Sequence, residues 1–183
     1  MLTTFAVYVD DAPGVLNRVA SLFRRRAFNI ASLTVGHTDR EGESRMTVVV
    51  DTDIPAERIA ANLYKLLDVR RVEVMSPRAS VARDLAMIKV ATSQTTRSEV
   101  MQLVEVFRAR VVDVAPESLI VEITGGEDKV EGLVEVLRPY GILEMVRTGR
   151  VAMSRGTAEP LTHAPPAGDA GGQAESDQVS YSM

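Results

Sequence analysis

The chemistry of this sequence is concentrated in one turn, Asp11-Ala12-Pro13-Gly14-Val15, where an alternating apolar run gives way to a helical pattern. Pro13 suits the first turn of a helix, because it lacks an N–H that would have no partner there. Gly14 has no Cβ, so a small molecule can approach the backbone closely. The N–H groups that open the helix attract a carboxylate, and Asp11 places a negative charge beside them. This pairing suits a zwitterion such as a free amino acid, although ordinary strand-to-helix turns use the same residues.

A second polar position, Asn29, lies between Phe28 and Ile30 at the start of the run that follows the helix. We expect this run to form a strand beside the first one, which would bring Asn29 close to Asp11 and Gly14. The asparagine could instead cap the preceding helix or satisfy a strand edge. Its expected closeness to the turn favours a binding role.

The sequence offers no set of residues that would make the chain an enzyme. It has two histidines, His37 in an expected hairpin loop and His163 near the C-terminus, and no cysteine. Thiolate catalysis, disulfides and Cys-ligated metals are therefore excluded. No phosphate loop, nucleophile elbow or metal-ligand spacing is present. We expect a binding protein without a catalytic site or a metal of its own.

Length and composition restrict the class of protein further. The chain has 183 residues, of which 45% are hydrophobic, and carries a formal net charge of −4. This length accommodates one domain or two small ones, and the negative charge argues against a nucleic-acid-binding protein. The chain starts directly with a strand pattern, and no apolar run approaches membrane-spanning length. We therefore expect a cytoplasmic protein.

The periodicity of the first half predicts the order β-α-β-β-α-β, which is the ferredoxin-like arrangement. In the second expected strand the apolar alternation changes phase between Ile30 and Leu33, which predicts a bulge near Ala31-Ser32. In the second expected helix, a buried stripe of four residues is expected. The elements are expected at residues 5–9, 15–23, 28–35, 45–50, 55–67 and 72–75, and the stripe at Ile59, Leu63, Leu66 and Leu67.

After a joint at Ser76-Pro77-Arg78 the same pattern returns, with a capping box formed by Thr96 and Glu99 at its first helix. Ser93-Gln94-Thr95 stands where the first half has its turn, so we expect no ligand there. Beyond Arg155 the composition is too polar to form a core. The expected domains are 1–76, 77–155 and a disordered tail, 156–183. The repeated elements are expected at residues 85–91, 96–107, 111–114, 119–123, 130–137 and 142–146, the last strand continuing to Met153.

Two classes of binding protein with this topology are free-standing amino-acid sensors and RNA-binding domains. RNA-binding sheets stack bases on exposed aromatic side chains, whereas this chain has four Phe and four Tyr. All the phenylalanines fall on stripes that we assign to the core. Arg24-Arg25-Arg26 is explained more simply as a helix end. The sequence therefore favours a sensor over an RNA-binding protein.

Three segments resemble the small, regulatory subunit of acetolactate synthase. They are the turn at residues 11–16, the strand at 28–35 and the segment Ser44-Arg45-Met46-Thr47. The first segment alone indicates an ACT domain, a broad class of amino-acid-sensing domains, and the other two are more specific. Residues 108–116 and Ser154-Arg155-Gly156 resemble the same family, so the likeness covers about residues 2–156.

The resemblance implies two tandem ferredoxin-like βαββαβ domains, the first an ACT domain, and a subunit without an active site. Such subunits bind the large catalytic subunit, which carries thiamine diphosphate, FAD and magnesium and forms acetolactate from two pyruvates. They activate it and confer feedback inhibition by valine or a related branched-chain amino acid. The effector site lies where two ACT domains meet in a homodimer. Carried over to this chain, the effector-binding positions are Asp11, Gly14 and Asn29, with backbone at Val15 and Ile30.

Overall fold

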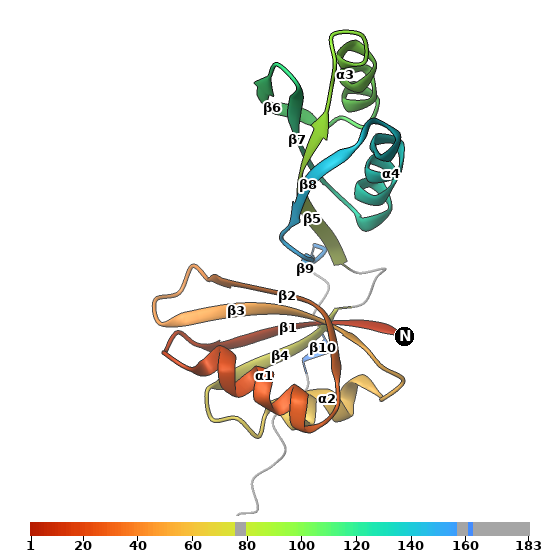
Figure 1. The fold of residues 1–183 in the computed structure, drawn as a ribbon. Helices are drawn as coiled ribbons and strands as arrows, with labels where there is room; N and C mark the ends of the chain where they lie inside the picture. Colours follow the sequence, from red (N-terminus) through yellow and green to blue (C-terminus); the bar gives the residue numbers. More distant parts are fainter. Residues whose placement is uncertain (76–79, 157–160, 163–183) are drawn as a thin grey trace, which may run out of the picture.

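The protein consists of two ferredoxin-like α+β units in the computed structural model, which describes residues 1–75, 80–156 and 161–162 (Figure 1). The first unit has a sheet in the order β10-β4-β1-β3-β2 with two helices on one face. Its elements are β1 (Leu2–Asp10), α1 (Val15–Arg25), β2 (Asn29–His37), β3 (Glu43–Asp51), α2 (Ala56–Leu63), β4 (Val69–Met75) and the two-residue β10 (Leu161–Thr162).

The second unit repeats this topology. Its sheet has the order β6-β7-β5-β8, which places the first and third strands of the unit in the centre, as in the first unit. The predicted pair of ferredoxin-like units is therefore confirmed. The elements are β5 (Ser80–Ala91), α3 (Arg97–Val106), β6 (Arg110–Ala115), β7 (Ser118–Gly125), α4 (Glu127–Leu137), the 3₁₀ helix η1 (Arg138–Tyr140), β8 (Ile142–Arg147) and β9 (Val151–Ser154).

The predicted bulge in β2 is present. The pairing of β2 with β3 changes register between Ile30 and Ser32. As a result, Ile30 and Leu33 both lie opposite buried valines of β3 and pack against the core, although they are three residues apart. Without the extra residue, the period of two along a strand would turn one of them to the other face.

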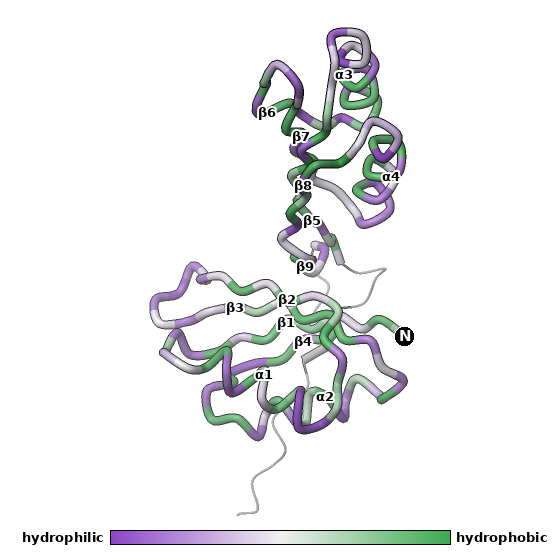
Figure 2. Tube along the Cα trace, in the orientation of Figure 1, coloured by the Kyte–Doolittle hydropathy of each residue, from purple (hydrophilic) through white to green (hydrophobic). Residues whose placement is uncertain are grey.

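Each unit has its own hydrophobic core between its sheet and its helices. In Figure 2, hydrophobic and hydrophilic residues alternate along α3 and α4, as expected for helices with one face on a sheet. Phe5, Phe23 and Phe28 are buried and Phe107 packs against the second core, as predicted. The predicted stripe of α2 is only partly correct, because the helix ends at Leu63 and Leu67 is fully exposed.

The predicted capping box of Thr96 and Glu99 does not form, because Thr96 precedes α3 without a side-chain cap hydrogen bond. The Ser93 N–H donates to Thr96 Oγ1 at 2.9 Å, and the Thr96 N–H donates to Ser93 Oγ at 3.2 Å. Glu99 instead accepts a hydrogen bond from the Tyr140 hydroxyl at 3.1 Å. The reciprocal bonds of Ser93 and Thr96 form in the turn before α3, which has Thr where a capping box requires Glu or Gln.

The last predicted strand is divided into two. β8 ends at Arg147, and after a turn β9 pairs with residues 80–83 at the start of β5. This two-stranded ribbon lies on the face of the first sheet that the helices leave open, where Ala82 and Ala152 pack with Ala6 and Met75. The open face of the ACT-like unit is therefore partly covered by the second unit of the same chain.

The joint at 76–78 and most of the tail 156–183 lie outside the described residues. Of the tail, Gly156 is described, and Leu161 and Thr162 pair with Val74 and Glu73 of β4. Among the described residues, no helix is long and apolar enough to cross a membrane.

Candidate functional site

The predicted turn connects β1 to α1 and leaves the helix N-terminus uncapped. Gly14 is the residue before the helix and has a left-handed conformation, with φ of 85°. No side chain in the described part of the chain caps this end of α1. The first N–H groups of a helix have no carbonyl partner within it and carry a partial positive charge. The electrostatics at this end of α1 therefore favour an anion such as a carboxylate.

The corresponding end of α3 in the second unit is different, because the hydroxyls of Ser93 and Thr96 already accept hydrogen bonds from backbone N–H groups there. The two units thus share a topology, but hydroxyl groups bond to backbone N–H groups in the turn before α3, whereas no side chain among the described residues caps the start of α1. This difference supports the prediction that a ligand binds to the first unit and not to the second.

Asp11 is held beside this turn by two neighbours. The Ser44 hydroxyl donates to Asp11 Oδ1 at 3.1 Å, and His37 Nδ1 lies 3.2 Å from Oδ2. His37 is the last residue of β2 and not a loop residue as predicted, although its side chain is largely exposed. The Asp11 side chain is thus oriented and still 43% exposed, so it remains accessible to a cation. In the sequence analysis, Ser44 was singled out only as part of a segment that carries the family resemblance.

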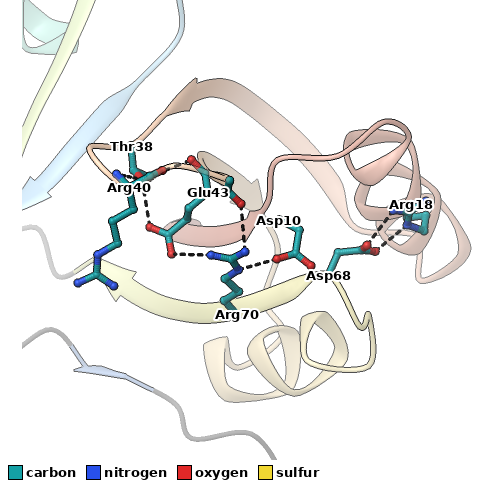
Figure 3. A network of polar contacts seen from close by, with 8 residues as sticks. Asp10, Arg18, Thr38, Arg40, Glu43, Asp68 and Arg70 are labelled. Atoms are coloured by element: carbon teal, nitrogen blue, oxygen red, sulfur yellow. Dashed lines mark hydrogen bonds and ion pairs between the residues drawn. The ribbon is translucent and has the colours of Figure 1, made fainter.

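Two groups of ion pairs fix the backbone around the turn (Figure 3). Arg70 on β4 contacts Asp10 Oδ1 at 2.5 Å and Glu43 Oε2 at 3.8 Å, and its guanidinium donates to the Gly42 carbonyl. On the other side, Arg18 of α1 makes a two-point contact with Asp68, at 2.6 and 2.8 Å. These contacts join α1 and the ends of β1, β3 and β4 into one corner.

The Arg18–Asp68 pair should make stability depend on pH. The hydrogen bond from Arg18 lowers the pKa of Asp68. The contribution of the ion pair to the free energy of unfolding is thus complete above the ordinary carboxyl pKa of about 3.9. It is lost as the pH falls through the lower pKa that Asp68 has in the folded state. We expect Arg18→Ala to lower the free energy of unfolding at pH 7, and expect this difference to shrink toward pH 2–3. Urea unfolding at both pH values measures it.

Arg25→Ala is the matched control, because Arg25 lies on the same helix and no ion pair is found for it among the described residues. Its effect on the free energy of unfolding should be small and independent of pH. A difference between wild type and Arg18→Ala that stays constant from pH 7 to pH 2 would contradict the role given to Asp68.

Asn29 is not where the sequence analysis placed it. β3 lies between β1 and β2, so β2 is not the neighbour of β1. Asn29 pairs with Asp51, which in turn pairs with Leu2 at the start of β1, whereas Asp11 follows the end of β1. Within one chain, Asn29 and Asp11 therefore lie at opposite ends of the sheet. The expectation that one chain brings them together is wrong, because β1 and β2 are both antiparallel to β3 and therefore run in the same direction, so the start of β2 lies far from the end of β1.

The side chains of Val15 and Ile30 belong to the core of the first unit. Val15 is 3% exposed, and Ile30 packs against the same cluster. Their side chains are thus not available to a ligand, and the family resemblance implied contacts only from their backbone. Arg45, which belongs to a motif of that resemblance, faces the open side of the sheet. Its guanidinium donates to the Tyr8 hydroxyl at 3.2 Å and to the Ala152 carbonyl of the second unit.

The two units match two family models that together span most of the chain. Residues 5–71 match the model "AHAS small subunit-like ACT domain", and residues 83–156 match "Small subunit of acetolactate synthase".

Relatives of known description agree with these models over the length of both units. The chain is 49% identical over 157 residues to a probable acetolactate synthase small subunit of Archaeoglobus fulgidus, covering 85% of this chain and 98% of that one. It is 50% identical over 154 residues to an acetolactate synthase small subunit of Mycobacterium bovis, covering 84% and 92%. The crystal structure of the small subunit from Thermotoga maritima superposes with a TM-score of 0.81 at 40% identity, covering 85% and 98%. The chain belongs to the family of acetolactate synthase small subunits.

Proposed function

We propose that this protein is the regulatory subunit that binds and activates the catalytic large subunit of acetolactate synthase, and makes it subject to inhibition by valine or a related branched-chain amino acid. The large subunit would carry the thiamine diphosphate, FAD and magnesium needed to condense two pyruvates. The observation that carries the proposal is the uncapped N-terminus of α1 at Gly14, beside the oriented carboxylate of Asp11. Membership of the family of acetolactate synthase small subunits supports the large subunit as the partner.

The corner at Gly14 suits the two charges of an amino acid. The effector carboxylate would face the N–H groups that open α1, and its ammonium would face Asp11. A charge-assisted hydrogen bond contributes roughly 1.5–3 kcal/mol, and burial of a valine side chain contributes about 1.5–3 kcal/mol more. Together these contributions amount to roughly 3–6 kcal/mol, a range that includes the about 4 kcal/mol required for a millimolar dissociation constant.

A homodimer would complete the site with Asn29 of a second copy. Among the described residues no strand pairs with the outer edge of β2, and such edges invite pairing with another chain. In an antiparallel pair of β2 strands related by a two-fold axis at Leu33, the central residue of the strand, Asn29 of one copy lies opposite His37 of the other. His37 contacts Asp11. The separation of Asn29 from Asp11 within one chain thus supports a site shared between two copies.

Reconstitution tests the proposal. The purified chain should show no acetolactate formation alone. When mixed with the large subunit it should raise the rate of acetolactate formation, and valine, leucine or isoleucine should reduce that rate. A chain that binds one of these amino acids but neither co-purifies with the large subunit nor changes its rate would be a free-standing sensor, and the proposal would be rejected.

A further inference from the structure

The two units of the chain are connected by a group of polar contacts that we call the latch. It consists of Ser32 and Thr34 on β2 and the turn 148–150 between β8 and β9. The Arg150 N–H donates to Ser32 Oγ at 2.9 Å. The Thr34 hydroxyl lies 3.2 Å from the Arg150 carbonyl and 3.4 Å from the Thr148 carbonyl. Both hydroxyls of β2 thus bind the backbone of the turn from the second unit.

Gly149 shows how close this approach is. Its φ is 86°, and a Cβ added there would lie 2.5 Å from Ser32 Oγ and 3.3 Å from Thr34 Oγ1. Any residue other than glycine would therefore be strained and would also collide with β2. The contact depends on glycine at this position in the turn.

The region around the latch is not a continuous apolar interface. A cavity of about 370 Å³ lies on one side, between Leu2, Ser32 and the turn 147–150. Another of about 350 Å³ lies on the other side, lined by Thr4, Met75 and Ala82. The Arg150 guanidinium runs between them and contacts Thr4 Oγ1 and Glu127 of α4. The polar contacts of the latch therefore lie beside open space, while the ribbon packs against Ala6 and Met75 nearby.

We propose that the latch couples the effector site to the second unit, so that occupancy of the site changes how the second unit is held. This inference rests on the proposed function, because it needs an effector at the corner shared with Asn29 and Ile30. These two residues start β2, and Ser32 follows directly after the bulge. A ligand that moves the start of this strand therefore moves Ser32 and Thr34, and with them the turn.

The double variant Ser32→Ala/Thr34→Val tests the latch in the reconstituted holoenzyme. We expect it to bind valine by calorimetry within about twofold of wild type and to activate the large subunit normally. The inhibition reached at saturating valine should fall at least about fivefold, the lower limit of typical coupling. Thr52→Val is the matched control, because its hydroxyl accepts a bond from the Ile54 N–H within the first unit. This control should be inhibited like wild type.

Gly149→Ala disturbs the same contact from the second unit and should give the same loss of inhibition with retained valine binding. If both latch variants are inhibited like wild type, the latch is not the coupling element. If the wild-type chain itself binds none of the three branched-chain amino acids, the proposed function fails instead. The two failures are thus distinguished by the binding measurement on the wild-type chain.

Discussion

Replacing Gly14 by aspartate is expected to abolish effector inhibition of the holoenzyme while leaving its activation in place. Three effects add at this position. The backbone φ of 85° is unfavourable for any residue with a side chain, and a Cβ would lie 3.1 Å from the Arg18 guanidinium, which Asp68 already holds. The new carboxylate would also stand at the helix N-terminus, where the effector carboxylate is proposed to bind. We expect the half-inhibitory concentration of valine to rise at least about tenfold.

Two further variants separate these effects. Gly14→Ala introduces the steric strain without the charge, so its half-inhibitory concentration should lie between those of wild type and Gly14→Asp. Gly126→Asp is the matched control, because Gly126 precedes α4 as Gly14 precedes α1, but with φ of −69° and no atom within 4 Å of an added Cβ. It should leave inhibition unchanged. If the Gly14→Asp variant is inhibited by valine as strongly as wild type, the assignment of the effector site to this corner is rejected.

A mixture of two insensitive chains should regain part of its inhibition. If each site combines Gly14 of one copy with Asn29 of the other, a dimer of one Gly14→Asp chain and one Asn29→Ala chain has one doubly damaged site and one intact site. Random assembly of equal amounts would leave about a quarter of all sites intact. We expect the co-expressed mixture, reconstituted with the large subunit, to show valine inhibition that neither variant shows alone.

The controls for this experiment are the two variants assembled separately and then combined without exchange of subunits, which should stay insensitive. If Asn29 serves the site of its own chain, every site in the co-expressed mixture is damaged and no inhibition returns. That result would reject the shared site while leaving the role of Gly14 open to its own test.

The sequence was sufficient to predict features that depend on one segment at a time. The phase change between Ile30 and Leu33 predicted the bulge in β2, because a half-buried strand must keep its apolar residues on one face. The turn at Gly14 was predicted from Pro13 and Gly14, whose conformational preferences are local. The order of elements in both units followed from the period of the apolar residues.

Features that depend on the arrangement of segments were predicted incorrectly or not at all. Apolar periodicity gives the face of a strand but neither its neighbour nor its direction, so the sequence analysis placed Asn29 next to Asp11 although β1 and β2 run in the same direction on either side of β3. The contact of His37 with Asp11 depends on the register of β2 with β3. Nothing in the local sequence indicated that Gly149 would meet Ser32, which is more than a hundred residues away.

β5 takes part in both the ribbon and the second sheet, so a rotation of the ribbon also rotates the second sheet. Residues 80–83 pair with β9 on the first unit, and residues 84–91 form the centre of the second sheet. A strand of 12 residues is about 36 Å long from its first to its last residue. If the ribbon tilts by about 10°, the far end of this strand is displaced by roughly 6 Å. A small rotation at the turn 148–150 would thus become a displacement of several ångströms at the far end of the second sheet.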